Sequence, residues 1–132
     1  MIHVCDTHAL VWFLSGQRRR LGRRALALLD RASSGLGEIR VSVASLHEVA
    51  ILLERGRLRS LGDWGGWIER VKAAPGLGLE PVTIEDVEHA RDFSMLDDPF
   101  DRLVAGTARR LSIPLISADE RIRGSRLVAV VW

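Results

Sequence analysis

The chain has 132 residues, a formal net charge of +2, 47% hydrophobic residues, 27% charged residues and one cysteine. This length suits one domain, residues 1–132, and the composition excludes disorder and a large uniform positive field. The lone Cys5 excludes an internal disulfide, and no apolar run approaches the roughly 20 residues needed to cross a bilayer, so we expect a soluble cytoplasmic protein.

In the first half of the chain, short apolar strands alternate with helices. Strands are predicted over residues 2–5 and 39–43, the second from its alternation of polar and apolar side chains. Helices are predicted over residues 7–14, 21–32 and 44–54. A weaker helix is predicted over 62–73, because it contains two adjacent glycines and is followed by Pro75-Gly76.

The second half repeats the alternation. Strands are predicted over 79–82, 115–117 and 127–131, with a turn or short helix over 119–123. Helices are predicted over 84–93, capped by Thr83, and over 98–111, where Asp98 is the cap and Pro99 the first helical residue. Strands that alternate with helices predict an α/β fold with a mostly parallel sheet covered by helices on both faces.

Four carboxylates stand at positions where such a sheet collects its functional residues. Asp6 directly follows the first strand, Asp119 closely follows the strand over 115–117, Asp101 lies in the first turn of a helix, and Glu48 interrupts an apolar helix. The strand ends of an open α/β sheet border its ligand crevice. Carboxylates that converge there repel one another unless a cation intervenes, and a hard divalent cation with oxygen ligands is the simplest neutraliser.

Each carboxylate also has a purely structural interpretation. Asp6 is a good helix N-cap, Asp119 is an ordinary turn residue, and Ser45 with Glu48 forms the pattern of a capping box. Against the last interpretation, the helix around Glu48 is apolar almost all round and therefore buried, and a buried glutamate needs a partner. In the string Asp97-Asp98-Pro99-Phe100-Asp101-Arg102, Arg102 is expected to neutralise one of three neighbouring acids.

These strings together resemble those of PIN-domain ribonucleases, and in particular the VapC-type toxins of bacterial toxin–antitoxin pairs. The resemblance covers nearly the whole chain and rests on four segments, which are Cys5-Asp6-Thr7-His8-Ala9-Leu10, Ser45-Leu46-His47-Glu48-Val49, Asp98-Pro99-Phe100-Asp101-Arg102-Leu103 and Ile116-Ser117-Ala118-Asp119. One segment alone is a weak signal, but the set is specific. It implies a PIN-like three-layer fold.

The resemblance also implies roles for individual residues. It implies that four acids hold Mg²⁺ or Mn²⁺, namely Asp6, Glu48, Asp101 and Asp119. It further implies two hydroxyl groups beside the site and one acid that supports Asp101, namely Thr7, Ser117 and Asp98. Asp97 departs from the family pattern, which often has His there, and has no assigned role. The implied partners are an RNA substrate, a cognate antitoxin and a second copy of the chain in a homodimer.

An all-carboxylate site selects a hard cation that activates water, and the resemblance implies that this water hydrolyses RNA phosphodiester bonds. One alternative is a catalytically silent PIN-like RNA-binding or scaffold protein, and another is a receiver- or phosphatase-type domain with Asp6 as phospho-acceptor. Basic residues are almost all arginine, which suits phosphate contact, although a GC-rich genome also explains this composition. Trp64 and Trp67 lie on one stripe, which core packing explains more simply than a groove for a partner peptide.

Overall fold

A parallel five-stranded sheet organises the molecule. The computed structural model describes all 132 residues, and the strands lie in the order β3-β2-β1-β4-β5. Their bounds are β1 (Ile2–Cys5), β2 (Glu38–Ser42), β3 (Leu77–Glu80), β4 (Leu115–Ile116) and β5 (Val130–Val131). Every pairing is parallel, so the prediction of an α/β fold with a mostly parallel sheet is confirmed.

Seven α-helices connect and cover the strands. Their bounds are α1 (Thr7–Leu14), α2 (Arg23–Ser33), α3 (Val43–Glu54), α4 (Trp64–Ala73), α5 (Ile84–Ala90), α6 (Pro99–Leu111) and α7 (Glu120–Ser125). Three single 3₁₀ turns are η1 (Arg18–Arg20), η2 (Arg59–Leu61) and η3 (Arg91–Phe93), the last of which completes the helix predicted over 84–93. None of the helices combines the length and apolarity needed to span a bilayer.

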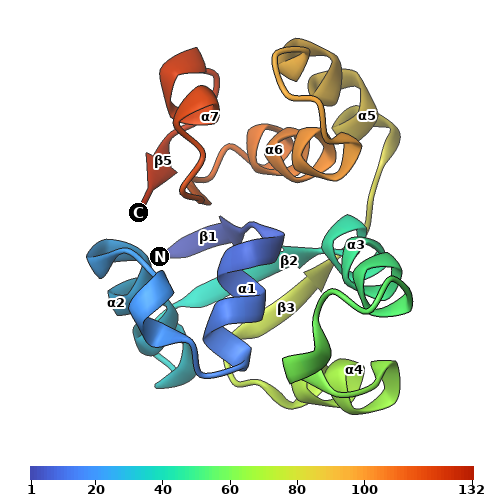
Figure 1. Cartoon of the computed structure of the whole chain (residues 1–132). Helices are drawn as coiled ribbons and strands as arrows, with labels where there is room; N and C mark the ends of the chain where they lie inside the picture. Colours follow the sequence, from blue (N-terminus) through green and yellow to red (C-terminus); the bar gives the residue numbers. More distant parts are fainter.

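The sheet separates two apolar cores. Cys5, Ile39 and Val41 face a core built with side chains of α1, α2, α3 and α4. Val4 and Leu115 face a second core built with side chains of η3, α6 and α7. Neighbouring residues of β1 thus point to opposite faces, as strand geometry requires. Figure 1 shows the resulting three layers, with α5, α6 and α7 on one side of the sheet and α1, α2 and α4 on the other.

The order of the strands creates one crevice. From β1 the chain passes outward to β2 and β3 on one side, and later returns to β4 and β5 on the other side. Ligands of open α/β sheets bind where the strand order reverses, outside the carboxyl ends of the strands. Here that place lies between the ends of β1 and β4, whose last residues Cys5 and Ile116 are paired.

Two local predictions are corrected by the structure. The N-cap of α3 is Ser42, whose hydroxyl accepts a hydrogen bond from the amide of Ala44, and the predicted capping box of Ser45 with Glu48 is wrong. The helix starts at Val43, one residue before its predicted start, because β2 ends directly at Ser42. Glu48 is consequently a residue of the second turn, where no backbone amide is free to bind it.

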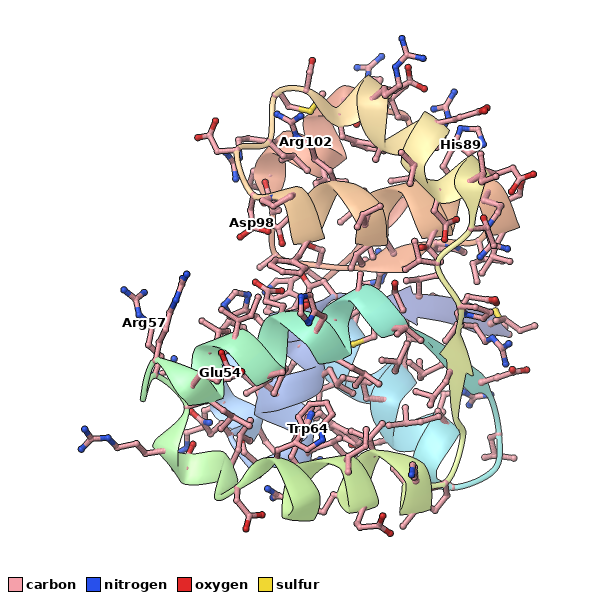
Figure 2. All side chains as sticks on the ribbon, turned by 90° about the vertical axis from the view of Figure 1, so that its right-hand side faces the viewer. Glu54, Arg57, Trp64, His89, Asp98 and Arg102 are labelled. Atoms are coloured by element: carbon pink, nitrogen blue, oxygen red, sulfur yellow. The ribbon has the colours of Figure 1, made fainter.

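The tryptophan stripe of α4 divides between core and surface. Trp67 is fully buried and Val71 nearly so, as the core-packing interpretation predicts. Trp64, the first residue of the helix, is 42% exposed. In Figure 2 it lies low on the α4 side, away from Asp98.

Candidate active site

Asp6 is held at the carboxyl end of β1 as the N-cap of α1. Its Oδ1 accepts a hydrogen bond from the amide of Ala9 at 2.9 Å, and its own amide donates to the carbonyl of Ile116 at 3.1 Å. The capping interpretation of Asp6 is therefore correct, and it does not exclude a second role. The cap fixes the carboxylate at the crevice beside β4.

Asp119 reaches the same crevice from the other side. Ser117, which is almost fully buried, follows β4, and its hydroxyl accepts a hydrogen bond from the amide of Asp119 at 3.1 Å. Asp119 is the N-cap of α7 and accepts from the amide of Arg121 at 2.9 Å. The Arg121 guanidinium also pairs with this carboxylate, at 3.1 Å between Nη2 and Oδ2.

Glu48 is the most deeply buried acid of the group. Its side chain projects from α3, the residue is 6% exposed, and Oε1 has no hydrogen-bond partner. Next to it, the buried hydroxyl of Thr7 donates to Ser45 Oγ at 3.0 Å, which ties the start of α1 to the start of α3. Glu48 thus has the burial of a core residue, and one of its two carboxylate oxygens lacks the partner that a buried polar atom requires.

The first turn of α6 brings two more acids to Glu48. Asp98 caps this helix, and its Oδ1 accepts hydrogen bonds from the amides of Phe100 at 2.8 Å and Asp101 at 3.1 Å. One carboxylate oxygen from each of Glu48, Asp98 and Asp101 lies within 4.8 Å of the others. Asp98 is therefore part of the acidic cluster, in addition to its predicted supporting role.

The expected neutraliser of these acids does not contact them. The Arg102 guanidinium donates instead to the backbone carbonyls of Leu96 and Ser94, so the prediction that it pairs with a neighbouring acid is wrong. Figure 2 shows Asp98 at the start of α6, with Arg102 directed toward the segment that precedes the helix. The cluster of Glu48, Asp98 and Asp101 is left without a cationic partner among the ion pairs of the structure.

Burial and mutual repulsion raise the pKa values of the clustered acids. The pKa of Asp101 rises to about 7, first because the group is desolvated and then because Asp98, Glu48 and Asp6 are negative. Desolvation is also the largest cause that raises the pKa of Glu48 and that of Asp6. For Asp6, the hydrogen bonds from Ala9 and Ser117 oppose this rise.

Asp119 shifts in the other direction. Burial alone raises its pKa, but hydrogen bonds from the Arg121 side chain and backbone outweigh burial and leave the pKa below its ordinary value. Among the four acids predicted to bind metal, Asp119 is therefore the one that already has a cationic partner. Asp119 is the most readily ionised of these four acids, and Arg121 already neutralises part of its charge.

A cavity of about 330 Å³ connects Asp6 and Asp119 to Asp101, which is one of the three clustered acids. Three of the predicted acids and one predicted hydroxyl group line it, namely Asp6, Asp101, Asp119 and Ser117. Asp101 belongs to both the cavity wall and the cluster with Glu48 and Asp98. The structure thus places Asp6, Asp101, Ser117 and Asp119 on one cavity wall, while Glu48 and Asp98 meet Asp101 outside that lining.

Comparison with known proteins identifies the family. The PIN domain family model matches residues 3–124. The chain belongs to the PIN domain family. Ribonuclease VapC22 of Mycobacterium tuberculosis is 27% identical over 122 residues, which are 92% of this chain and 89% of that protein.

Solved structures share the PIN fold over their whole length. A VapBC2 structure from Rickettsia felis, bound to a DNA fragment from its promoter, has a TM-score of 0.71 at 11% identity and covers 99% of this chain and 98% of its own. A DNA-bound VapBC from Salmonella typhimurium has a TM-score of 0.66 at 15% identity, with 99% and 97% covered. At these identities the likeness concerns the fold, which confirms the expected PIN-like three-layer architecture.

The acidic site of this PIN domain has the donor set of a hard divalent cation. All candidate donors are carboxylate oxygens, which suit Mg²⁺ and Mn²⁺ and not a thiolate-bound metal. The buried Oε1 of Glu48 lacks a partner, and the pKa of Asp101 is raised because like charges surround it. A divalent ion would give this oxygen of Glu48 a partner and would lower the pKa of Asp101. The residues present therefore fit such an ion.

Several residues of the cavity wall were not singled out from the sequence. They are His8, Trp12, Arg121 and Trp132. Arg121 was visible only as a member of an arginine cluster, and the two tryptophans lie at opposite ends of the chain. The sequence did offer one signal for His8 and Trp12. They are four residues apart on the helix that Asp6 caps, so they lie on the same side of that helix.

Proposed function

We propose that this PIN domain, over residues 1–132, is a divalent-metal-dependent ribonuclease and the toxin of a toxin–antitoxin pair. The observation that carries the proposal is the partnerless, buried Oε1 of Glu48 within a cluster of three carboxylates. A fold does not tolerate such an arrangement for stability alone, because repulsion and desolvation both act against it. Its cost is offset when a cation binds.

Four acids would hold Mg²⁺ or Mn²⁺, namely Asp6, Glu48, Asp101 and Asp119. A bound ion of this kind supplies Lewis acidity, which activates water and stabilises charge on a phosphodiester. The chain itself positions the ligands. Asp98 fixes the first turn of α6 through two backbone amides and so orients Asp101, while Thr7 and Ser117 secure the backbone near Glu48 and Asp119.

The relatives support the ribonuclease and toxin assignments. The relative that matches 92% of this chain is named a ribonuclease, and the solved structures that share the fold are toxin–antitoxin complexes. By analogy, we propose a cytoplasmic RNA as substrate, a cognate antitoxin as partner and a homodimer as the assembly. The intact acidic cluster favours this function over a silent RNA-binding or scaffold role, which does not require four converging acids.

The test compares acids of the cluster with an exposed acid of the same helix. Glu48→Gln and Asp101→Asn are expected to abolish RNA cleavage and to weaken Mn²⁺ binding measured by calorimetry. Glu54→Gln is the matched control, since Glu54 is exposed in the last turn of α3 (Figure 2) and lines neither cavity nor cluster. Cleavage by wild type should require Mg²⁺ or Mn²⁺ and stop with EDTA.

Other outcomes select between the rival functions. Full cleavage by Asp101→Asn, or cleavage insensitive to EDTA, would refute the proposed mechanism. RNA binding would favour the scaffold if the RNA is not cleaved and if expression of the protein does not arrest growth. Labelling of Asp6 by an acyl phosphate would favour the phospho-acceptor interpretation.

A further inference from the structure

Three aromatic residues line the cavity that Asp6, Asp101 and Asp119 also line. They are His8 and Trp12 of α1 and Trp132, which follows β5. The rings of Trp12 and Trp132 have centroids 6.1 Å apart in an edge-to-face arrangement, and those of His8 and Trp12 are 5.7 Å apart. We refer to His8, Trp12 and Trp132 as the aromatic wall.

The aromatic wall is held in place by close packing. Both tryptophans are partly exposed and pack against the core below α1 and α2. Gly22, the N-cap of α2, leaves room for the Trp132 ring, since a Cβ at this position would lie only 2.6 Å from Trp132 Cδ1. Core packing therefore accounts for one side of each ring. It does not account for the sides that face the cavity.

Cationic groups flank the aromatic wall. The Arg20 guanidinium lies over the Trp12 ring, with Cζ 5.7 Å from the ring centroid. The exposed Arg121 lines the same cavity beside Asp119. Aromatic faces bordered by arginines are the arrangement by which proteins hold unpaired nucleotides, because bases stack on the rings while guanidinium groups contact phosphates.

We propose that the aromatic wall binds one unstacked base of a single-stranded RNA, with the adjacent phosphate directed toward the acid cluster. This proposal rests on the proposed function and assigns the residues that hold one base of the substrate. A cavity of about 330 Å³ is at the lower end of the range for small-ligand pockets, roughly 300–1,000 Å³, so it admits one nucleotide and not a duplex. Base and phosphate contacts then lie in the same crevice.

The first experiment measures RNA binding separately from cleavage. Binding of a fluorescent single-stranded RNA is followed by anisotropy in the Asp101→Asn background, so that the RNA remains intact. Adding Trp12→Leu or Trp132→Leu keeps an apolar side chain but removes the ring, and should weaken binding about 5- to 100-fold. Trp12→Phe should restore most of the affinity. Trp64→Leu, which changes an exposed tryptophan outside the cavity, should have no effect.

A second series distinguishes stacking from a general effect on folding. Oligonucleotides that lack one base at a time are tested against Trp12→Leu, with circular dichroism as a check of folding. At the position that occupies the aromatic wall, removal of the base should weaken wild-type binding and make Trp12→Leu ineffective. An equal loss with every oligonucleotide would overturn the proposal.

The outcomes also separate this inference from the proposed function. Cleavage by wild type combined with unchanged RNA affinity in both tryptophan variants would overturn the aromatic wall and leave the ribonuclease intact. Tryptophan-dependent RNA binding without metal-dependent cleavage would refute the ribonuclease and retain the binding site. Tighter binding of duplex than of single-stranded RNA would also contradict the inference.

Discussion

The carboxylates beside the two ends of α6 differ in whether they have a cationic partner. At the C-terminal end of the helix, the fully buried Asp86 of α5 accepts hydrogen bonds from the Arg110 guanidinium and, at 3.1 Å, from the hydroxyl of Thr107. It also closes a capping box with Thr83. At the N-terminal end, Glu48, Asp98 and Asp101 converge without a cation. Paired carboxylates stabilise the fold, whereas unpaired ones point to a ligand.

The contrast extends to the surroundings of each end. Arg110 also lies 3.5 Å from Glu80, whose carboxylate is shared with Arg40 of β2 at 3.4 Å. This network fastens α5 and α6 to the β3 edge of the sheet. The helix dipole favours both ends, since arginines lie near its C-terminus and aspartates near its N-terminus. The dipole alone does not compensate three carboxylates, so the N-terminal end is the one that fits the proposed ion.

The largest expected effect on stability comes from breaking the paired end. Asp86→Ala should lower the free energy of unfolding by about 3–5 kcal/mol, because the Arg110 guanidinium loses a buried partner and α5 loses its capping box. Urea denaturation measures this change. Asp92→Ala is the control, since Asp92 is exposed and 4.0 Å from Arg109, and should cost less than about 1 kcal/mol. Equal losses would contradict the distinction.

Removal of a charge at the unpaired end should have the opposite effect on the metal-free protein. Glu48→Gln is expected to leave the free energy of unfolding unchanged or to raise it, because a partnerless buried charge disappears. In the same variant, Mn²⁺ affinity measured by calorimetry should fall at least about 10- to 100-fold. A loss of several kcal/mol in EDTA would mean that Glu48 is a structural residue after all.

The pH dependence of stability should reveal Asp101 in the metal-free protein. Its pKa is about 7 in the folded state and lower in the unfolded chain, so the folded state binds more protons between these values. The free energy of unfolding in EDTA should therefore decrease as pH rises from about 4 to about 7. Urea denaturation at pH 5 and pH 8 measures the difference. Asp101→Asn should reduce it, leaving the smaller slope of Glu48 and Asp6, whose pKa values are also raised, and an unchanged slope would contradict the assignment to Asp101.

The smallest expected effect on the free energy of unfolding is at Arg121, which lines the cavity. Arg121→Ala removes an exposed ion pair with Asp119 and should change the free energy of unfolding by only about 0.2–1 kcal/mol. The pKa of Asp119 should rise, because hydrogen bonds from Arg121 now lower it. Carboxyl NMR titration of the metal-free protein measures this shift. Arg123→Ala, which removes only the contact with Glu120, is the control and should leave Asp119 unchanged.

Local chemistry made most elements of the fold predictable. Alternation identified β2, and the Asp98-Pro99 pair marked the start of α6, because cap and proline act on neighbouring backbone groups. The start of α3 was predicted within one residue, but the capping pattern of Ser45 with Glu48 was misleading. Ser45 had the right neighbours for a cap, but the pairing of β2 with β1 and β3 ends at Ser42 and fixes where the helix begins. A tertiary contact therefore overrode a local pattern.

The acids of the site were predictable for a similar reason. Three of the clustered or cavity-lining acids, Asp6, Asp98 and Asp119, are N-caps of helices that follow a strand or a loop, so a local role and a shared edge of the sheet coincide. Partners were not predictable. Arg102 adjoins Asp101 in sequence yet binds backbone carbonyls, whereas Arg121 contacts Asp119. Side-chain direction on a helix, and not sequence proximity, decides such pairings.

By itself, the amino-acid sequence determined the alternation of strands and helices, the PIN family strings and the identity of the acids, since all of these depend on neighbouring residues. Only the tertiary structure decided that Oε1 of Glu48 lacks a partner, that Asp101 belongs to both the cavity wall and the acidic cluster, and that Trp12 meets Trp132. The reason is the order of the sheet. It places β5 beside β4 and β4 beside β1, and so brings the two ends of the chain to one crevice.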